Sequence, residues 1–254
     1  MSMKAGDTLM EITYIDHSGF LLEWENCYWL FDYYKSDIPV MNPNKKIFVF
    51  VSHKHKDHFN PKIFDLYNMY EDVEYVLSSD IKMLELKEQQ MGIHQDLMDK
   101  IIWVHPSQTY HLNVHEVNEI NLKTLVSTDE GVAFLLKYQE KTIYYAGDLN
   151  LWVWPGETEA YNKDMTIRFE DQMKALKDLR IDVAFAPLDP RQEEYYYLGL
   201  ESLLSTAKVK YVFPMHFWDQ PLIIQQYKKD KASSMHDTEV IEIQQSGQKW
   251  HIQI

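Results

Sequence analysis

Three histidines and an aspartate lie within the seven residues that follow the apolar run Ile47–Val51 (IFVFV). The run is typical of a buried strand. Residues two apart at a strand end point the same way, so His53 and His55 can reach one metal ion together. Asp57 and His58 follow on the turn and can reach a second ion nearby. Imidazole and carboxylate ligands suit zinc, and also iron or manganese. An ordinary charged loop is the alternative, but three histidines and an aspartate so close together favour a metal site.

The pattern H-x-H-x-D-H resembles that of the metallo-β-lactamase superfamily, and other segments resemble this family in the same order along the chain. They are Ile12–Leu22 (its opening hairpin), Leu30–Asp32 (an early strand that ends in aspartate), Tyr144–Asp148 (the strand whose aspartate bridges two metals) and Phe213–His216 (the strand that delivers the last histidine). The resemblance implies an α/β (α+β) fold, an αββα four-layer sandwich with the site at the sheet edges. It also implies that Asp148 and His216 are metal ligands.

One part of the family pattern is missing. The family supplies another histidine between the motif and the bridging aspartate, but residues 124–132 (TLVSTDEGV) contain none. Asp129 is our candidate substitute, and the alternative is that it only caps the turn before Gly131. His111 and His115, upstream on an expected alternating strand, are further alternatives. The segments S-T-D-E-G, G-D-L-N and P-L-D-P-R resemble a bacterial subgroup of the superfamily, and this resemblance implies no particular substrate.

Five further residues are candidates for contacts with the substrate or with the metal ligands. His17, in the opening hairpin, lies either near the mouth of the site or in an ordinary turn. Asp32 is expected to orient the metal loop through hydrogen bonds, because metal ligands need supporting partners. Asp189 and Arg191 form either a surface pair or a pocket pair for a substrate carboxylate or phosphate. Trp154 is expected to line the pocket or to pack in the core.

The elements that position these residues can be read from apolar patterns. Strands are predicted at Leu9–Ile15, Phe20–Glu25, Tyr28–Phe31, Ile47–Val51, Val73–Leu77, Val132–Tyr138, Thr142–Ala146, Asp182–Ala186, Tyr211–Phe213, Val240–Ile243 and Trp250–Ile254. The pairs 132–138 with 142–146 and 240–243 with 250–254 are predicted hairpins, the second turning at Ser246-Gly247. Helices are predicted from Pro61 to Tyr70 with Asn60 as N-cap, from Ser79 or Asp80 to Gln90 with Gly92 at the end, at Phe169–Arg180 and at Leu200–Ala207.

Composition narrows the classes of partner. The 254 residues carry 25 basic and 39 acidic side chains, a net charge of −14, which disfavours nucleic acid and anionic membranes as partners. We see no linker, and we expect one domain over residues 1–254. Cys27 is the only cysteine, so no intrachain disulfide can form and a cytoplasmic location fits. We find no signal peptide and no apolar run long enough for a membrane span. The oligomeric state stays open.

We therefore interpret the chain as a metal-dependent hydrolase with Asp57 and Asp148 as catalytic residues. Two zinc ions are expected, with manganese or iron as alternatives. Such ions lower the pKa of a bound water from about 15.7 toward about 7, which suits cleavage of a small-molecule ester, lactone, amide or phosphodiester. The patterns G-x-S-x-G, G-x-G-x-x-G and a P-loop are absent from the sequence. The alternatives are a di-iron oxidoreductase of the same fold and a metal-binding protein without catalysis.

Overall fold

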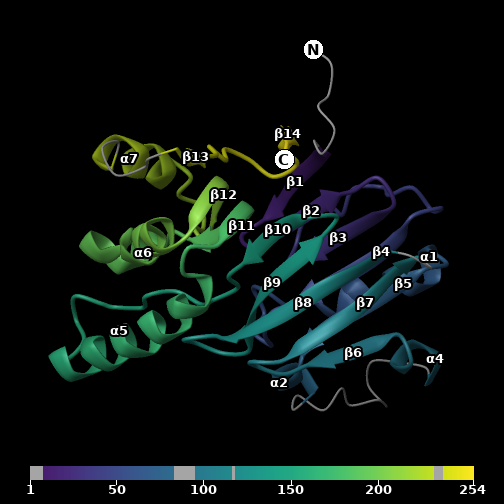
Figure 1. Ribbon diagram of the computed structural model, residues 1–254, viewed down its shortest axis with the longest axis horizontal. Coiled ribbons are helices and arrows are strands. Elements are labelled where there is room, and N and C mark those ends of the chain that lie inside the picture. The colour runs from purple at the N-terminus through teal and green to yellow at the C-terminus, as the bar shows by residue number, and fades with distance from the viewer. Residues whose placement is uncertain (1–7, 83–94, 116–117, 232–236) are drawn as a thin grey trace. The chain divides into compact units, whose positions relative to one another are not determined.

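Two compact units make up the computed structural model of the chain (Figure 1). The structure describes residues 8–82, 95–115, 118–231 and 237–254. Unit 1 contains the chain up to residue 104 together with 113–118 and 245–254, and unit 2 contains 105–112 and 119–244. The single domain expected over residues 1–254 stays a prediction.

Unit 1 is built on a seven-stranded sheet. In spatial order its strands are β14 (Lys249–Gln253), β1 (Leu9–Asp16), β2 (Gly19–Glu23), β3 (Cys27–Phe31), β4 (Lys46–Val51), β5 (Val73–Ser78) and β6 (Ile101–Val104). Strands β14, β1, β2 and β3 are antiparallel neighbours, whereas β3, β4, β5 and β6 run parallel. The carboxyl ends of the parallel strands therefore meet at one edge of this sheet.

Strand β4 shows why the apolar runs of unit 1 form strands. All of Ile47–Val51 is buried, as predicted for this run. Alternation along the strand sends Val49 into a cluster with Ile63 and Leu77 on one face. Phe50 points to the other face and stacks on Phe31, with ring centroids 4.8 Å apart. A fully buried Phe contributes about 1.5–3 kcal/mol to folding, so these strands are held from both faces.

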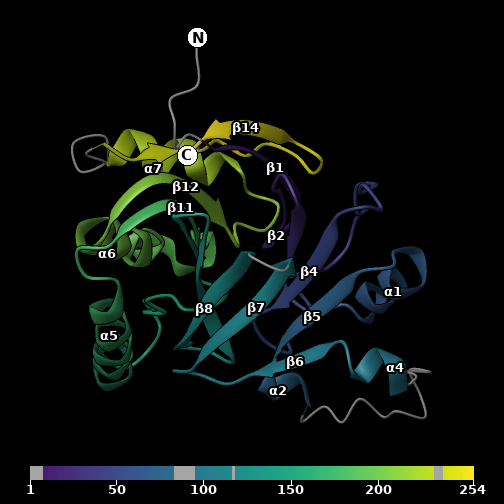
Figure 2. The same ribbon diagram turned by 45° about the vertical axis from the view of Figure 1, so that its right-hand side comes forward.

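Most of a second seven-stranded sheet belongs to unit 2 (Figure 2). Its strands in spatial order are β13 (Glu239–Val240), β12 (Lys208–Met215), β11 (Arg180–Pro187), β10 (Lys141–Tyr145), β9 (Val132–Tyr138), β8 (Asn118–Val126) and β7 (Thr109–His115). Strands β10 to β13 run parallel, and β9 is antiparallel to β8 and β10. The predicted hairpin of residues 132–138 and 142–146 is confirmed as β9 and β10.

Short helices connect the strands. They are η1 (Pro61–Asp65), α1 (Leu66–Met69), α2 (Ser79–Lys82), α4 (Gln95–Met98), α5 (Glu159–Met173), η2 (Lys174–Leu176), η3 (Pro190–Tyr195), α6 (Leu198–Thr206) and α7 (Leu222–Asp230). Helix α6 packs on β11, β12 and α5, and both views show α5 and α6 on the same side of these strands (Figure 1, Figure 2). Within the described residues, no helix has the length and apolar character that a bilayer span requires.

Three of the predicted helices agree with the structure as far as it is described. The helix from Pro61 is present as η1 and α1, and the helix near Leu200–Ala207 is α6. The helix predicted from Ser79 begins as α2, and its continuation over residues 83–94, with Gly92, lies outside the described residues.

The helix predicted at Phe169–Arg180 is misplaced. Helix α5 begins at Glu159 and ends at Met173, and Arg180 already belongs to β11. Its N-cap is Thr158, whose side chain accepts a hydrogen bond from the Tyr161 N–H. The long polar first half of α5 carries little apolar periodicity, and the few buried residues of α5 lie mostly near its end. The sequence pattern therefore pointed to the last turns only.

The last predicted hairpin is wrong. Residues 239–240 (β13) pair in parallel with β12 in the second sheet, whereas residues 249–253 (β14) pair with β1 in the first. The turn at Ser246-Gly247 exists, and Gly247 has the positive φ of 79° that favours glycine. A turn between two apolar runs indicates that the chain reverses direction. Long-range packing determines which strand each run pairs with.

Asn60 fixes the start of the helix that follows the motif, and its loss should destabilise unit 1. Its side-chain oxygen accepts from the Lys62 N–H (3.0 Å), and its amide donates to the Tyr34 carbonyl (2.6 Å). We expect Asn60→Ala to lower the free energy of unfolding by about 1–2 kcal/mol in urea denaturation. Asn68→Ala, the same change at an exposed helical position, is the control and should have little effect. Equal stability of the two variants would contradict the cap.

Candidate metal centre

The ligand-type residues of unit 1 lie at the carboxyl ends of β3, β4 and β5. Asp32 follows β3, Ser52 follows β4, and Asp80 follows β5 within α2. The carboxylate of Asp32 accepts from the Ser52 N–H (2.7 Å) and from its hydroxyl (2.5 Å). The Asp80 carboxylate accepts from the backbone N–H of Lys54 (3.0 Å). The segment Ser52–His58 is thus held by both neighbouring strands.

His53 and His55 point toward each other, as the two-residue spacing predicts. His53 Nε2 and His55 Nδ1 are 3.1 Å apart, and the two rings are nearly perpendicular. Ligand atoms on one tetrahedral zinc ion, at bonds of about 2.0–2.1 Å, lie roughly 3.4 Å from each other. The other ring nitrogen of His53, Nδ1, lies 2.9 Å from the Ser52 hydroxyl, which orients the imidazole.

Asp32 also holds His58. Its Oδ2 lies 2.7 Å from His58 Nδ1, and both side chains are fully buried. Ligand atoms of Asp32, His53 and His58 lie within 4.8 Å of one another. Because both Asp32 oxygens already accept hydrogen bonds from this loop, its place suits the supporting role expected from the sequence. The contact leaves His58 with Nε2 as its ligand atom.

His17 lies against Asp57, with 3.4 Å between His17 Nε2 and Asp57 Oδ2. Burial of Asp57 opposes its ionisation, but the hydrogen bond to His17 and the charge of His58 outweigh burial and hold the pKa of Asp57 well below its usual range. Ligand atoms of His17, Asp57 and His58 lie within 4.8 Å of one another. His17 lies in the turn between β1 and β2, but it is only 3% exposed.

Unit 2 gathers a second cluster at the carboxyl ends of its own parallel strands. Asp148 follows β10, Asp189 follows β11 and His216 follows β12. Asp189 Oδ2 lies 2.9 Å from His216 Nδ1, and His216 Nε2 lies 3.5 Å from Asp148 Oδ1. All three side chains are buried. The carboxylate behind His216 therefore turns its Nε2 toward Asp148.

Asp189 and Arg191 match neither sequence alternative fully. Asp189 is fully buried, so the pair is not an ordinary surface pair. The Asp189 carboxylate also contacts His216. Arg191 donates to both Asp189 oxygens through Nε and Nη2. Burial raises the pKa of Asp189, but His216 and Arg191 outweigh burial and lower it to about 2. Asp189 is an anion that orients His216, and Arg191 stabilises this charge.

The loop with Asp129 lies beside the loop with Asp148. Carboxylate oxygens of Asp129 and Asp148 lie within 4.8 Å of each other, although Asp129 is exposed. Thr128 Oγ1 joins the two loops, since it donates to the Asn150 carbonyl (2.6 Å) and accepts from the Asn150 N–H (3.1 Å). The Asn150 side chain in turn donates to Gln192 (2.9 Å). Buried side chains therefore fix Asp129 and Asp148 as a pair.

Three tryptophans flank the second cluster. Trp152 lies edge-on to His216 (5.5 Å between centroids) and donates from Nε1 to the Asp148 carbonyl (2.9 Å). Trp154 stacks in parallel on Trp152 at 5.9 Å, which places it one ring further away. Trp218 lies edge-on to His216 at 5.6 Å. Trp152 and Trp218 contact the candidate ligand His216, whereas a pocket role for Trp154 stays a prediction.

Three residues of the two clusters have backbone conformations in the left-handed region. His17, Asp32 and His216 have positive φ angles of 52°, 36° and 62°. Non-glycine residues rarely adopt this region, because it costs of order 1–3 kcal/mol, and such residues cluster at functional sites. Each of the three contacts a candidate metal ligand or is one. The strain supports a functional reason for these positions.

His111 and His115 belong to neither cluster. Both are exposed on β7, and His111 pairs with Glu119 (3.4 Å). No group of potential metal ligands within the described residues includes either of them.

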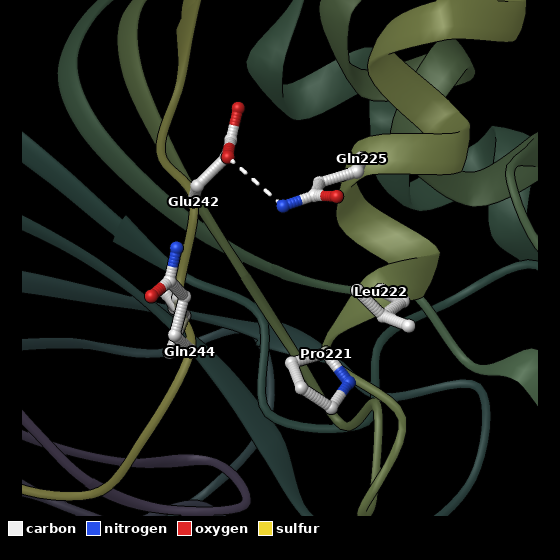
Figure 3. Close-up of a pocket in the computed structure, with 6 residues that line it drawn as sticks. Pro221, Leu222, Gln225, Glu242 and Gln244 are labelled. Atoms are coloured by element: carbon white, nitrogen blue, oxygen red, sulfur yellow. Dashed lines mark hydrogen bonds between the residues drawn. The ribbon is translucent and has the colours of Figure 1, made fainter.

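A groove of about 280 Å³ lies between the first turn of α7 and residues 242–244 of the chain (Figure 3). None of the candidate site residues lines this groove.

Sequence analysis did not identify four residues that support the clusters, which are Ser52, Thr128, Asn150 and Gln192. Asn150 lies inside the G-D-L-N segment, two residues after Asp148, and Gln192 directly follows P-L-D-P-R. The only available signal was a polar side chain next to a strand end. Their partners lie 20 to 42 residues away along the chain, so only the fold shows that they bond.

The donor atoms of each unit fit a divalent metal ion. Neutral imidazoles and ionised carboxylates are the ligands of zinc and related ions, and each candidate imidazole is oriented by a contact to its other nitrogen or to a neighbouring ligand. His53, His55, Asp57 and His58 would be the ligands from unit 1, and Asp129, Asp148 and His216 those from unit 2.

Residues 11–216 match the family model described as the β-lactamase superfamily domain. The chain therefore belongs to the metallo-β-lactamase superfamily, and the α/β fold class expected from the sequence, the αββα sandwich of this type, is confirmed. A search of curated proteins found no match.

Solved structures of the same fold are distant in sequence. The metallo-hydrolase Igni18 from Ignicoccus hospitalis is 17% identical with a TM-score of 0.62, covering 96% of this chain and 99% of that chain. The metallo-β-lactamase fold protein YhfI from Bacillus subtilis is 14% identical with a TM-score of 0.60 and the same coverage. CmlA, a diiron β-hydroxylase from Streptomyces venezuelae, is 12% identical with a TM-score of 0.55, covering 97% of this chain and 54% of that chain. At these identities the likeness shows the fold alone.

Gly199 makes room for Asn150, so a side chain there should disturb the carboxylate pair. A Cβ at Gly199 would lie 1.8 Å from Asn150 Oδ1. We expect Gly199→Ala to break the Asn150–Gln192 bond, lower the free energy of unfolding by about 1–3 kcal/mol and weaken metal retention during dialysis. Gly156→Ala, where a Cβ meets nothing within 4 Å, is the control. Wild-type stability and metal content in Gly199→Ala would show that Asn150 has no positioning role.

Proposed function

We propose that this protein is a metal-dependent hydrolase that uses a binuclear centre on a small-molecule substrate. The observation that carries the proposal is the pair of His/Asp clusters at parallel strand ends in a chain of the metallo-β-lactamase superfamily. Names of solved neighbours with this fold, such as Igni18, include metallo-hydrolases. These names support hydrolysis as the class of reaction. The substrate must be identified by experiment.

In this proposal the candidate ligands form two sets. His53, His55 and Asp148 would hold one ion. Asp57, His58 and His216, together with Asp148, would hold the other. Asp129 replaces the histidine that the family supplies at the first position. Its support is the distance within 4.8 Å between carboxylate oxygens of Asp129 and Asp148.

The chain's own residues have distinct tasks around the bound ions. When bound, the two ions lower the pKa of a water toward neutrality and polarise the bond to be cleaved. Asp57 is ionised and oriented by His17, so it would accept a hydrogen bond from a water in the site and orient that water. Asp148 offers a second buried carboxylate for the same purpose. This arrangement suits an ester, lactone, amide or phosphodiester.

A di-iron oxidoreductase is the second candidate, favoured by the fold likeness to CmlA. This chain spans 54% of that structure, so the likeness concerns one part of CmlA only. The metal decides between the two functions. Zinc or colourless manganese in the purified protein supports hydrolysis, whereas iron with a charge-transfer band in the visible spectrum supports redox chemistry. A protein that binds metal but turns over no substrate in either class of assay would be the third alternative.

We propose zinc as the metal and the cytoplasm as the location. Cys27, the only cysteine of the sequence, is buried and cannot form an intrachain disulfide, which suits a reducing compartment. The net charge of −14 disfavours RNA or DNA as substrate. A panel of nitrophenyl esters, lactones and bis-nitrophenyl phosphate, assayed with metal counting, tests the proposed function directly.

Removing both histidines of the motif should abolish activity without unfolding the chain. We expect His53→Ala together with His55→Ala to lose bound metal and all hydrolysis, because both imidazoles point into one site while apolar strands hold unit 1. Metal content, circular dichroism and turnover are measured on one preparation. His111→Ala with His115→Ala, which removes two exposed histidines from β7, is the control. Full metal content in the 53/55 variant would exclude these ligands, and unfolding would show that the metal is also structural.

The two metal positions should differ in affinity. Asp129 should contribute to the metal affinity of the weaker position. Dialysis against a mild chelator should release one ion before the other, because the position of His53 and His55 lacks its third histidine. In Asp129→Ala this first release should occur at a lower chelator concentration. Asp171→Ala, at an exposed helical aspartate, is the control. Simultaneous release of both ions would contradict the asymmetry, and an unchanged release in Asp129→Ala would remove Asp129 from the ligand set.

A further inference from the structure

Helix α5 contacts the loop of residues 126–131, which leads from the end of β8 to β9. Gln172 Oε1 accepts a hydrogen bond from the Val126 N–H (3.0 Å), and Arg168 Nη1 donates to the Thr128 carbonyl (3.2 Å). The helix and the 126–131 loop both belong to unit 2, and both views show α5 beside this end of β8 (Figure 1, Figure 2). Two side chains of one helix therefore bond to the backbone of this loop.

The spacing of these two contacts fits a helix that lies along an extended chain. Arg168 and Gln172 are four residues apart, so they lie on one face of α5 with a rise of about 6 Å between them. Two residues of extended chain, such as the step from Val126 to Thr128, span roughly 6.6 Å. The two contacts are therefore compatible with each other, and we call the pair of Arg168 and Gln172 the α5 clamp.

Packing holds the helix from which the α5 clamp projects. Met165, Phe169 and Met173 recur every four residues, and all three are buried. Arg168 is oriented by Asp164, whose carboxylate accepts a hydrogen bond from Nε (3.0 Å). Its guanidinium thus has a partner on the helix as well as in the 126–131 loop. The α5 clamp therefore connects the loop to a packed element of unit 2.

The 126–131 loop carries Asp129, whose exposed side chain is not fixed by burial. Its place beside Asp148 therefore depends on what holds the loop backbone. On one flank, Thr128 Oγ1 bonds the Asn150 N–H and carbonyl and so joins the loop to the segment after β10. Within the loop, Ser127 Oγ accepts a hydrogen bond from the Asp129 N–H (3.2 Å). The α5 clamp holds the other flank.

We propose that Arg168 and Gln172 are positioning residues, which hold Asp129 beside Asp148 and thereby raise the affinity of the weaker metal position. The assignment of Asp129 to this position rests on the proposed hydrolase function. A ligand that is already in place loses little conformational entropy when the ion binds. A 126–131 loop released from α5 samples more conformations, so Asp129 binds the ion less tightly.

A chelator titration of the zinc-loaded protein tests the effect on metal affinity. The clamp variant combines Arg168→Ala with Gln172→Ala. We expect it to release its first ion at a chelator concentration about two- to tenfold lower than the wild type, the factor that corresponds to one hydrogen bond, and its second ion as the wild type does. Lys163→Ala, which removes the same charge from an exposed position of α5, is the control. Wild-type release from the clamp variant would overturn the inference.

A double-mutant cycle with Asp129→Ala separates positioning of Asp129 from a general loss of stability. If the α5 clamp acts through Asp129, adding the clamp variant to Asp129→Ala leaves the first release where Asp129→Ala alone puts it. The same fold-change in both backgrounds would overturn the inference, because the clamp would then act on the metal without Asp129. Wild-type release from Asp129→Ala alone would also overturn it, since Asp129 would not be a ligand.

Amide hydrogen exchange of the metal-free protein tests the hold of α5 on the loop independently of the proposed function. We expect the Val126 amide to exchange faster in Gln172→Leu, which lacks the acceptor, and at the wild-type rate in Gln172→Glu, whose carboxylate still accepts from this N–H. Wild-type exchange in Gln172→Leu would overturn the inference. If the wild type retained no metal, the proposed function would fail, whereas faster exchange in Gln172→Leu would still support the hold of α5 on the 126–131 loop.

Discussion

The candidate site depends on one geometric constraint, which is that neighbouring parallel strands end at the same edge of a sheet. Unit 1 places Asp32, Ser52 and Asp80 after β3, β4 and β5, and unit 2 places Asp148, Asp189 and His216 after β10, β11 and β12. Neighbouring strands lie about 4.8 Å apart, so strand pairing sets the backbone distance between residues at adjacent strand ends, whatever rotamer each side chain adopts. Apolar burial on both sheet faces supplies the free energy that keeps these polar ends in place.

The same constraint explains how much the sequence could predict. The runs IFVFV, YYAG and YVFPM indicate buried strands, and polar residues directly after such runs must lie at a strand end. The family resemblance pointed to Asp148 and His216, whereas reasoning from strand ends located the His53–His58 segment, and nearly all predicted strands agree with the structure. Reasoning from strand ends needed only local patterns, because strand and strand end are properties of a few consecutive residues. The family resemblance then supplied the fold class, which local patterns do not determine.

Features that depend on distant partners were missed or misplaced. The strands at residues 239–240 and 249–253 were expected to pair with each other, but each pairs with a strand of a different sheet. Asn150 and Gln192 carry no sign in the sequence that they bond across 42 residues. Helix α5 has so few buried positions in its first half that packing, and not periodicity, determines where it begins. In each case the deciding contact joins residues that no sequence window contains together.

Both clusters hold a histidine in the same way, and this similarity says more about the site than either contact alone. In unit 1, Asp32 follows β3 and binds Nδ1 of His58, which lies beyond the neighbouring strand β4. In unit 2, Asp189 follows β11 and binds Nδ1 of His216, which follows the neighbouring strand β12. Both aspartates are fully buried, and a buried carboxylate is costly unless it is paired. The imidazole that pairs with it is fixed with Nε2 directed away from the strand end. Burial of the aspartate therefore gives each histidine a defined ligand atom from the fold itself, independently of any ion.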